Sequence, residues 1–219
     1  MICRVCRLLC AAVVAVVVAV PVALAANGEP QKKLTKADQA KARAISLRQS
    51  DFPAGWVGKP NTNTSQDNPR CSSYNPDQSD LIETGDVDSP DFSRPEGSFV
   101  SSSVGIFKTR KMAQTGYARV ARPQLPKCFA ELFTKGLAPA RVQVLQVGPL
   151  AFRQLGDRSN AYRLRADVTV QGTTVPTTID IVLFNRGRAD VAMIFAGLFR
   201  PLPASFEQSL AARVAARAA

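Results

Sequence analysis

Four arginines in the last third of the chain are the side chains best suited to hold a ligand. Arg163 and Arg165 lie two residues apart in an alternating segment, so both point to the same face of a predicted strand. Arg186 and Arg188 lie at the adjacent hairpin turn. Because guanidinium groups bind carboxylates and phosphates through paired hydrogen bonds, these arginines predict an anion-binding patch. The alternative is a solvated sheet face with ordinary ion pairs to the neighbouring acids Asp167, Asp180 and Asp190.

Trp56, the single tryptophan of the chain, is a second candidate for ligand binding. Its ring could stack on a sugar at the mouth of a pocket, because an indole has a broad apolar face and a polar edge. A lone tryptophan more often fills the edge of a hydrophobic core. Both interpretations stay open at this point.

The chain contains no histidine, and this excludes the commonest forms of nucleophilic catalysis. Ser–His–Asp and Cys–His arrangements both need an imidazole base. Zinc sites built on histidine and cysteine lack their ligands for the same reason, and no glycine-rich phosphate loop follows a strand. We therefore expect a protein that is not an enzyme and has no metal or cofactor.

Four acids between residues 83 and 91 are the remaining group that could do chemistry. Carboxylates bind calcium, but the spacing matches no calcium loop and the glycine turn is absent, so a solvated acidic loop is the simpler interpretation. Glycoside hydrolysis needs two carboxylates at a defined separation, which a sequence does not supply. A secreted hydrolase therefore stays as an alternative. The four acids are Glu83, Asp86, Asp88 and Asp91.

The first 25 residues have the pattern of a signal peptide. Arg4 and Arg7 precede an apolar run from Leu8 to Leu24, and Ala23-Leu24-Ala25 supplies the small residues that a signal peptidase reads. The alternative is an uncleaved anchor, because the apolar run is close to the shortest that spans a bilayer. Cleavage after Ala25 predicts a protein exported from the cytoplasm.

The exported part contains two cysteines, Cys71 and Cys128. In an oxidising compartment such a pair predicts one disulfide, and two free thiols are the alternative. Without the signal peptide the chain has 26 basic and 17 acidic residues, a net charge of +9. That charge predicts attraction to anionic membrane or cell-wall surfaces. Nucleic acid is not an expected partner outside the cytoplasm.

The segments that position these residues are predicted to form one domain. A short flexible lead-in, residues 26–34, precedes it. The domain is expected to cover residues 35–219, a length that suits a single core. A helix is predicted from Thr35 to about Gln49. Residues 59–95 are predicted to be a long irregular segment, held at Cys71 and by a short element around Leu81-Ile82. A strand is expected over 98–107, followed by two helices that begin after Thr109 and near Pro126.

The last third has the clearest pattern. Strands are predicted over 141–147 and 162–171, then to 184, then over 189–196, with turns at Gly172 and at 185–188. A final helix repeats Phe206, Leu210 and Val214 at helical spacing. Consecutive hairpins without βαβ alternation predict an α+β fold: an antiparallel sheet of about four to five strands packed with about four helices.

The order of these parts resembles a known class of proteins. A helix leads into Asp51-Phe52-Pro53-Ala54-Gly55-Trp56, and Cys71, a helix with Cys128 and a strand meander follow. This order is similar to actinobacterial secreted sensor-like domains, among them the extracellular sensor domains of mycobacterial serine/threonine kinases. More distantly it resembles the Mog1/PsbP-like α-β-α sandwich, over about residues 40–215. The kinase sensors carry more disulfides than the one available here.

The resemblance implies a non-catalytic domain that binds something outside the cell, and it transfers no binding residue. Together with the residues above, it predicts a non-enzymatic extracytoplasmic binding or sensor-like domain. The expected partner is an anionic envelope component or another extracytoplasmic protein, with peripheral association to membrane or cell wall. The alternatives are a secreted hydrolase using paired carboxylates and a structural envelope protein held by charge.

Overall fold

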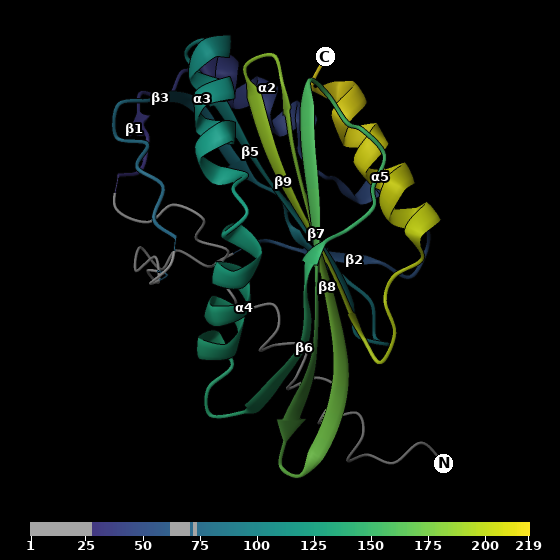
Figure 1. Ribbon diagram of the computed structural model, residues 1–219. Coiled ribbons are helices and arrows are strands. Elements are labelled where there is room, and N and C mark those ends of the chain that lie inside the picture. The colour runs from purple at the N-terminus through teal and green to yellow at the C-terminus, as the bar shows by residue number, and fades with distance from the viewer. Residues whose placement is uncertain (1–27, 62–70, 72–73) are drawn as a thin grey trace.

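The computed structural model describes residues 28–61, 71 and 74–219, and the predicted signal peptide lies outside these residues. Within the described part, no helix is long and apolar enough to cross a membrane. The fold is a mixed α+β arrangement in which helices cover both faces of one large sheet (Figure 1). In the described residues the sheet has nine strands.

Five long strands form the antiparallel body of the sheet. Their spatial order is β5, β9, β8, β7, β6, so the last four follow one another as a meander with β6 at the sheet edge. Hairpin turns join β7 to β8 and β8 to β9, as the sequence predicts. The strands are β5 (Ser98–Phe107), β6 (Arg141–Pro149), β7 (Arg158–Val170), β8 (Thr173–Arg186) and β9 (Ala189–Leu198).

The prediction of a long irregular segment over 59–95 is wrong in its second half. β3 (Ile82–Asp88) pairs antiparallel with β5, and β4 (Asp91–Ser93) also pairs with β5. Two short strands, β1 (Gln31–Lys32) and β2 (Val57–Lys59), pair with β3 and β4. β1 is parallel to β3 and lies within the expected lead-in. The sheet is therefore larger than the four to five strands expected.

The sequence pattern does not indicate β3, because polar side chains occupy positions where an amphipathic strand has apolar ones. Glu83, Asp86 and Asp88 interrupt the alternation that identifies the later strands. The strand exists because β5 supplies its hydrogen-bond partners and helix α2 (Lys36–Ile45) packs against it. Pairing with a neighbour here overrides weak intrinsic strand propensity.

Four α-helices form the outer layers of the described chain, matching the expected number. α3 (Arg110–Val120) and α4 (Leu125–Gly136) lie on one face of the sheet, and α5 (Ala204–Arg217) lies with α2 on the other (Figure 1). Two predicted caps are confirmed: the Thr35 hydroxyl accepts from the Asp38 N–H, and the Thr109 hydroxyl from the Met112 N–H, each at 3.1 Å. A short 3₁₀ helix, Gln49–Asp51, follows α2.

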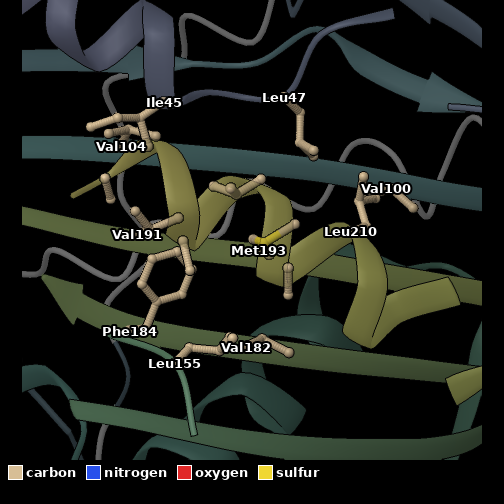
Figure 2. Close-up of a cluster of buried hydrophobic side chains, with 14 of the residues drawn as sticks. Ile45, Leu47, Val100, Val104, Leu155, Val182, Phe184, Val191, Met193 and Leu210 are labelled. Atoms are coloured by element: carbon tan, nitrogen blue, oxygen red, sulfur yellow. The ribbon is translucent and has the colours of Figure 1, made fainter. Parts of the chain in front are cut away.

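Each face of the sheet has its own hydrophobic core. Under α4, the alternating residues of β7 pack against the buried face of that helix, including Leu164 and Phe133. Figure 2 shows the other core, where Ile45 of α2 and Leu210 of α5 meet strand residues such as Phe184 and Met193. The opposite alternation of β7 places Arg163 and Arg165 on the α5 side of the sheet.

Candidate functional site

A groove with a cavity volume of about 510 Å³ lies on the α5 side of the sheet, beside the edge strand β6. We call it the arginine groove. Its floor is made of polar side chains from three neighbouring strands: Gln146, Arg163, Arg165, Asp167 and Thr178. Its walls are apolar and come from β6, β8 and the segments that follow β6 and β9: Leu145, Pro149, Leu150, Ala151, Pro176, Phe199 and Pro201.

Arg163 is held in the floor by a carboxylate beneath it. Its Nε and Nη2 atoms donate to the two oxygens of Asp180 at 2.7 and 2.5 Å, and Asp180 is only 1% exposed. Such a two-pronged pair neutralises the guanidinium and fixes its plane. Arg163 therefore forms one of the ordinary ion pairs that the sequence left open as an alternative.

Glu207, in the first turn of α5, completes this buried group. Burial, together with the charge of the neighbouring Asp180 and a hydrogen bond to it, raises the pKa of Glu207 to about 8. At neutral pH the Glu207 carboxyl therefore stays protonated and donates a hydrogen bond to the Asp180 carboxylate. Arg163, Asp180 and Glu207 together carry no net charge.

Arg165 differs from Arg163 although it lies only two residues away. Its side chain is exposed in the groove, and within the described residues it has no ion pair or hydrogen bond. Across the sheet it faces Gln146 on β6 and Thr178 on β8. Asp167, the next residue on the same face, is half-buried and also without a partner in the described chain. These side chains are free to bind a ligand.

Phe199 forms the rim of the groove, and sequence analysis did not single it out. The residue is 56% exposed, and its backbone has a positive φ of 67°. A bulky residue rarely adopts that conformation, which costs free energy and is concentrated at functional sites. The Phe199 N–H donates to the carbonyl oxygen of Pro176 at 2.6 Å, which fixes the loop against β8. An aromatic residue in the segment just after a predicted strand was the available signal.

The other two arginines of the predicted patch lie elsewhere. Arg186 is six residues along β8 from Asp180, a separation of about 20 Å. Its Nη1 donates to the Ala215 carbonyl near the end of α5 at 2.9 Å. Arg188 donates to the Phe107 carbonyl at 2.7 Å and to Asp38 at 2.5 Å. The structure thus brings Arg163 and Arg165 together, but not with Arg186 and Arg188.

Trp56 belongs to an aromatic cluster at the edge of the core. Its side chain is 6% exposed and stacks on Phe206, with ring centroids 5.4 Å apart. Phe52 packs on it at 5.1 Å, and the Arg94 guanidinium lies 6.0 Å from the ring centre. This placement agrees with a core-edge residue, because no open ring face is left for a sugar.

The acids between residues 83 and 91 lie on β3 and β4 rather than in a loop. Burial raises the pKa of Glu83 to about 8 and that of Asp91 to about 6, with nearby carboxylates adding to both shifts. Asp190, on β9, also has a pKa raised to about 8 by burial and accepts a hydrogen bond from Asn185 at 2.5 Å. Within the described chain, no three potential ligands are grouped to hold a metal ion.

Cys71 and Cys128 lie together, with their Cα atoms 5.5 Å apart and their sulfur atoms joined. That separation is normal for a disulfide. The link ties the segment before β3 to the buried face of α4, on the opposite side of the sheet from the arginine groove.

A second cavity, of about 370 Å³, adjoins the groove and shares Pro149 and Leu150 with it. It is lined without any charged residue: Ala121, Pro123, Pro149, Leu150, Phe152, Gln154, Ser159, Asn160, Ala161, Tyr162 and Val182. The arginine groove therefore has charged side chains in its lining, and the cavity beside it has none.

Comparison with known proteins identifies no family for this chain. No protein-family model matches the sequence, and no curated protein matches it at a significant level. Among solved structures, it is similar to LpqN, which is involved in cell envelope biogenesis of Mycobacterium tuberculosis. The identity is 10%, the TM-score is 0.34, and the likeness covers 75% of this chain and 76% of LpqN. The likeness is weak, and the function proposed below rests on the groove.

Proposed function

We propose that this protein is a non-enzymatic, extracytoplasmic binding or sensor-like domain that holds an envelope ligand in the arginine groove. The observation that carries the proposal is the groove itself, with apolar walls, a polar floor and an arginine whose charge is unpaired in the described chain. Its volume of about 510 Å³ lies within the range of known ligand pockets. Arg165 supplies an exposed guanidinium that can donate several hydrogen bonds to a bound envelope ligand.

An extracytoplasmic location is supported by two features of different kinds. The first 25 residues have a signal-peptide pattern. Cys71 and Cys128 are joined in the fold, and disulfides persist in oxidising compartments. Both features fit a protein that works outside the cytoplasm, at the membrane surface or cell wall.

A binding role is favoured over hydrolysis because of where the carboxylates lie. Among the described residues that line the groove, Asp167 is the one acid. Asp180 and Glu207 are hydrogen-bonded to each other beneath Arg163 and are 1% and 2% exposed. Hydrolysis of a glycoside needs two carboxylates separated by the reacting bond, and this pair leaves no space for one.

Native mass spectrometry tests the proposal. Residues 26–219, purified from an oxidising host, should carry an added mass that disappears on denaturation. Arg165→Ala should reduce the fraction carrying that mass at least fivefold, whereas Arg43→Ala, an exposed arginine on α2, should leave it unchanged. An added mass that both variants retain equally would exclude the groove as its site.

Salt separates this proposal from a structural protein held by charge. Attachment to envelope fragments through exposed charges alone should collapse in about 0.5 M salt, where charges are screened within a few ångströms. Binding in a groove with apolar walls should keep most of its affinity. If Arg165→Ala and Arg43→Ala weaken attachment equally and salt abolishes it, charge alone explains the binding.

A further inference from the structure

We propose that the ligand of the arginine groove is a saccharide, with one sugar ring stacked on Phe199 and its hydroxyl groups bound by the polar floor. This inference rests on the proposed function, because it names the chemical class of ligand for the same groove. It follows from the charge balance of the floor, the arrangement of its hydrogen-bonding groups and the conformation of Phe199.

The floor has arginines but little net charge. Arg163 is neutralised by Asp180, which lies beneath it at hydrogen-bonding distance. Arg165 has no direct ion pair in the described chain, but Asp167, two residues further along β7, lines the same groove with the opposite charge. A floor of this kind gives a simple anion no large electrostatic advantage, because the acids oppose it. It favours a ligand that both donates and accepts hydrogen bonds.

A ligand that carries hydroxyl groups meets this requirement, because each hydroxyl both donates and accepts hydrogen bonds. Arg165 offers only donors and Asp167 only acceptors, while Gln146 and Thr178 offer both. Gln146, Arg165 and Thr178 lie directly opposite one another on three neighbouring strands. They therefore form a polar row about 10 Å long, at the ordinary spacing of strands. A ligand with hydroxyl groups around its edge can satisfy several members of this row at once.

Phe199 gives the groove an aromatic surface next to that row. Its N–H is bound to the carbonyl of Pro176, and Pro176 lies opposite Asp167 on the neighbouring strand. The backbone of Phe199 has a φ of 67°, and the residue is 56% exposed at the rim. An exposed ring beside hydrogen-bonding groups matches a sugar, which has polar edges and an apolar face of C–H groups. This is the role that the sequence left open for Trp56, whose ring is buried.

The adjoining cavity extends the same site for a ligand longer than one ring. It shares Pro149 and Leu150 with the groove, and its lining contains Gln154, Ser159 and Asn160 but no charged side chain. A mostly apolar lining with a few uncharged polar side chains suits the C–H face and the hydroxyl groups of a further sugar unit, and it disfavours an anionic group. We therefore expect oligosaccharides to bind more tightly than monosaccharides.

The test is a titration of the folded domain, residues 26–219, followed by amide NMR and calorimetry. The probes are trisaccharides of glucose, galactose, mannose and N-acetylglucosamine, together with inorganic phosphate and vesicles of anionic phospholipid. We expect at least one trisaccharide to bind, with shifts at the groove amides, and to bind more tightly than its monosaccharide. Phe199→Ala should weaken that binding at least tenfold, and Asp167→Asn should weaken it severalfold.

Two control variants separate a lost contact from a damaged fold. Phe199→Tyr keeps the aromatic ring and should retain binding within about twofold. Val57→Ala removes an equally exposed apolar side chain, on β2, and should have no effect. The circular dichroism spectrum and melting temperature of every variant show whether it is folded. Equal affinity of Phe199→Ala and the unsubstituted protein would overturn the stacking role.

The outcome also distinguishes this inference from the proposed function. If no trisaccharide binds, while phosphate or anionic vesicles bind and Arg165→Ala abolishes that binding, the groove is a binding site but its ligand is not a saccharide. If no probe binds and native mass spectrometry finds no added mass, both the saccharide and the small-ligand function are wrong.

Discussion

Arg163 and Arg165 have different environments although they share one strand face. Arg163 covers the buried carboxylate of Asp180, whereas Arg165 is exposed and has no partner in the described chain. Arg163 therefore contributes to the stability of the fold, and Arg165 is available for binding a ligand. A double substitution of both arginines would mix the two effects.

The two single variants should separate in stability. Arg163→Ala leaves Asp180 buried without its counter-charge, and we expect the free energy of unfolding to fall by about 3 kcal/mol. Arg165→Ala should change it by no more than about 0.5 kcal/mol, as is usual for an exposed side chain. Urea denaturation of both variants measures the difference. Equal losses would mean that Asp180 does not depend on Arg163.

Glu207 should make stability depend on pH. Its pKa is raised from 4.5 to about 8 in the folded protein, so between these values the folded state binds a proton that the unfolded state has lost. The contribution of this group to stability therefore falls as pH rises from about 4.5 to about 8. Glu83 and Asp190 have similar raised values and should add to the same slope.

Glu207→Gln removes this titration but keeps a group that can donate to Asp180. We expect the variant to lose less stability between pH 6 and pH 9 than the unsubstituted protein. Glu96→Gln, at an exposed acid, is the control and should leave the slope unchanged. Denaturation curves at several pH values decide the matter, and parallel slopes for all three proteins would contradict it.

At the scale of elements, the Cys71–Cys128 link fixes a segment with little core of its own. Cys128 lies in the buried stripe of α4, so the link attaches the segment before β3 to a well-packed helix. A cross-link of this kind stabilises mainly by reducing the freedom of the unfolded chain.

Intact mass spectrometry should find the protein two hydrogens lighter than its reduced form. The linked residues are 57 positions apart, and loop entropy predicts that reduction lowers the free energy of unfolding by about 4 kcal/mol. Denaturation with and without reductant measures this loss. Detection of two free thiols in protein from an oxidising host would show that the bond does not form.

At the scale of the whole molecule, two cores share one sheet. Leu132 of α4 and Leu210 of α5 are buried on opposite faces, at 4% and 0% exposure. Because β7, β8 and β9 contribute side chains to both cores, neither layer can lose its packing without weakening the other. The domain should therefore unfold as one cooperative unit.

Leu132→Ala and Leu210→Ala form a matched pair that tests this cooperativity. Each should lower the free energy of unfolding by about 3 kcal/mol through lost burial and a residual cavity. Each should also shift the same single transition, whether followed by tryptophan fluorescence or by circular dichroism. Two separate transitions in either variant would show that the layers unfold independently.

The features that were predictable from sequence are local ones. The caps at Thr35 and Thr109 and the alternation of β7 depend on residues a few positions apart, and the structure confirms them. β3 was missed because its polar sequence carries no local strand signal and depends on pairing with β5. Phe199 was missed because exposure and a positive φ are properties of the folded loop.

Composition and local spacing define the chemistry available to this protein: no imidazole, one cysteine pair after the predicted signal peptide, and arginines alternating along a strand. Which of these groups meet depends on strand pairing and packing. Strand register placed Asp180 opposite Arg163, and the length of β8 separated Arg186 from both by about 20 Å. The groove combines segments from β6 to the loop after β9, up to 56 residues apart between Leu145 and Pro201. Such proximity arises from long-range pairing and packing, which no local pattern encodes.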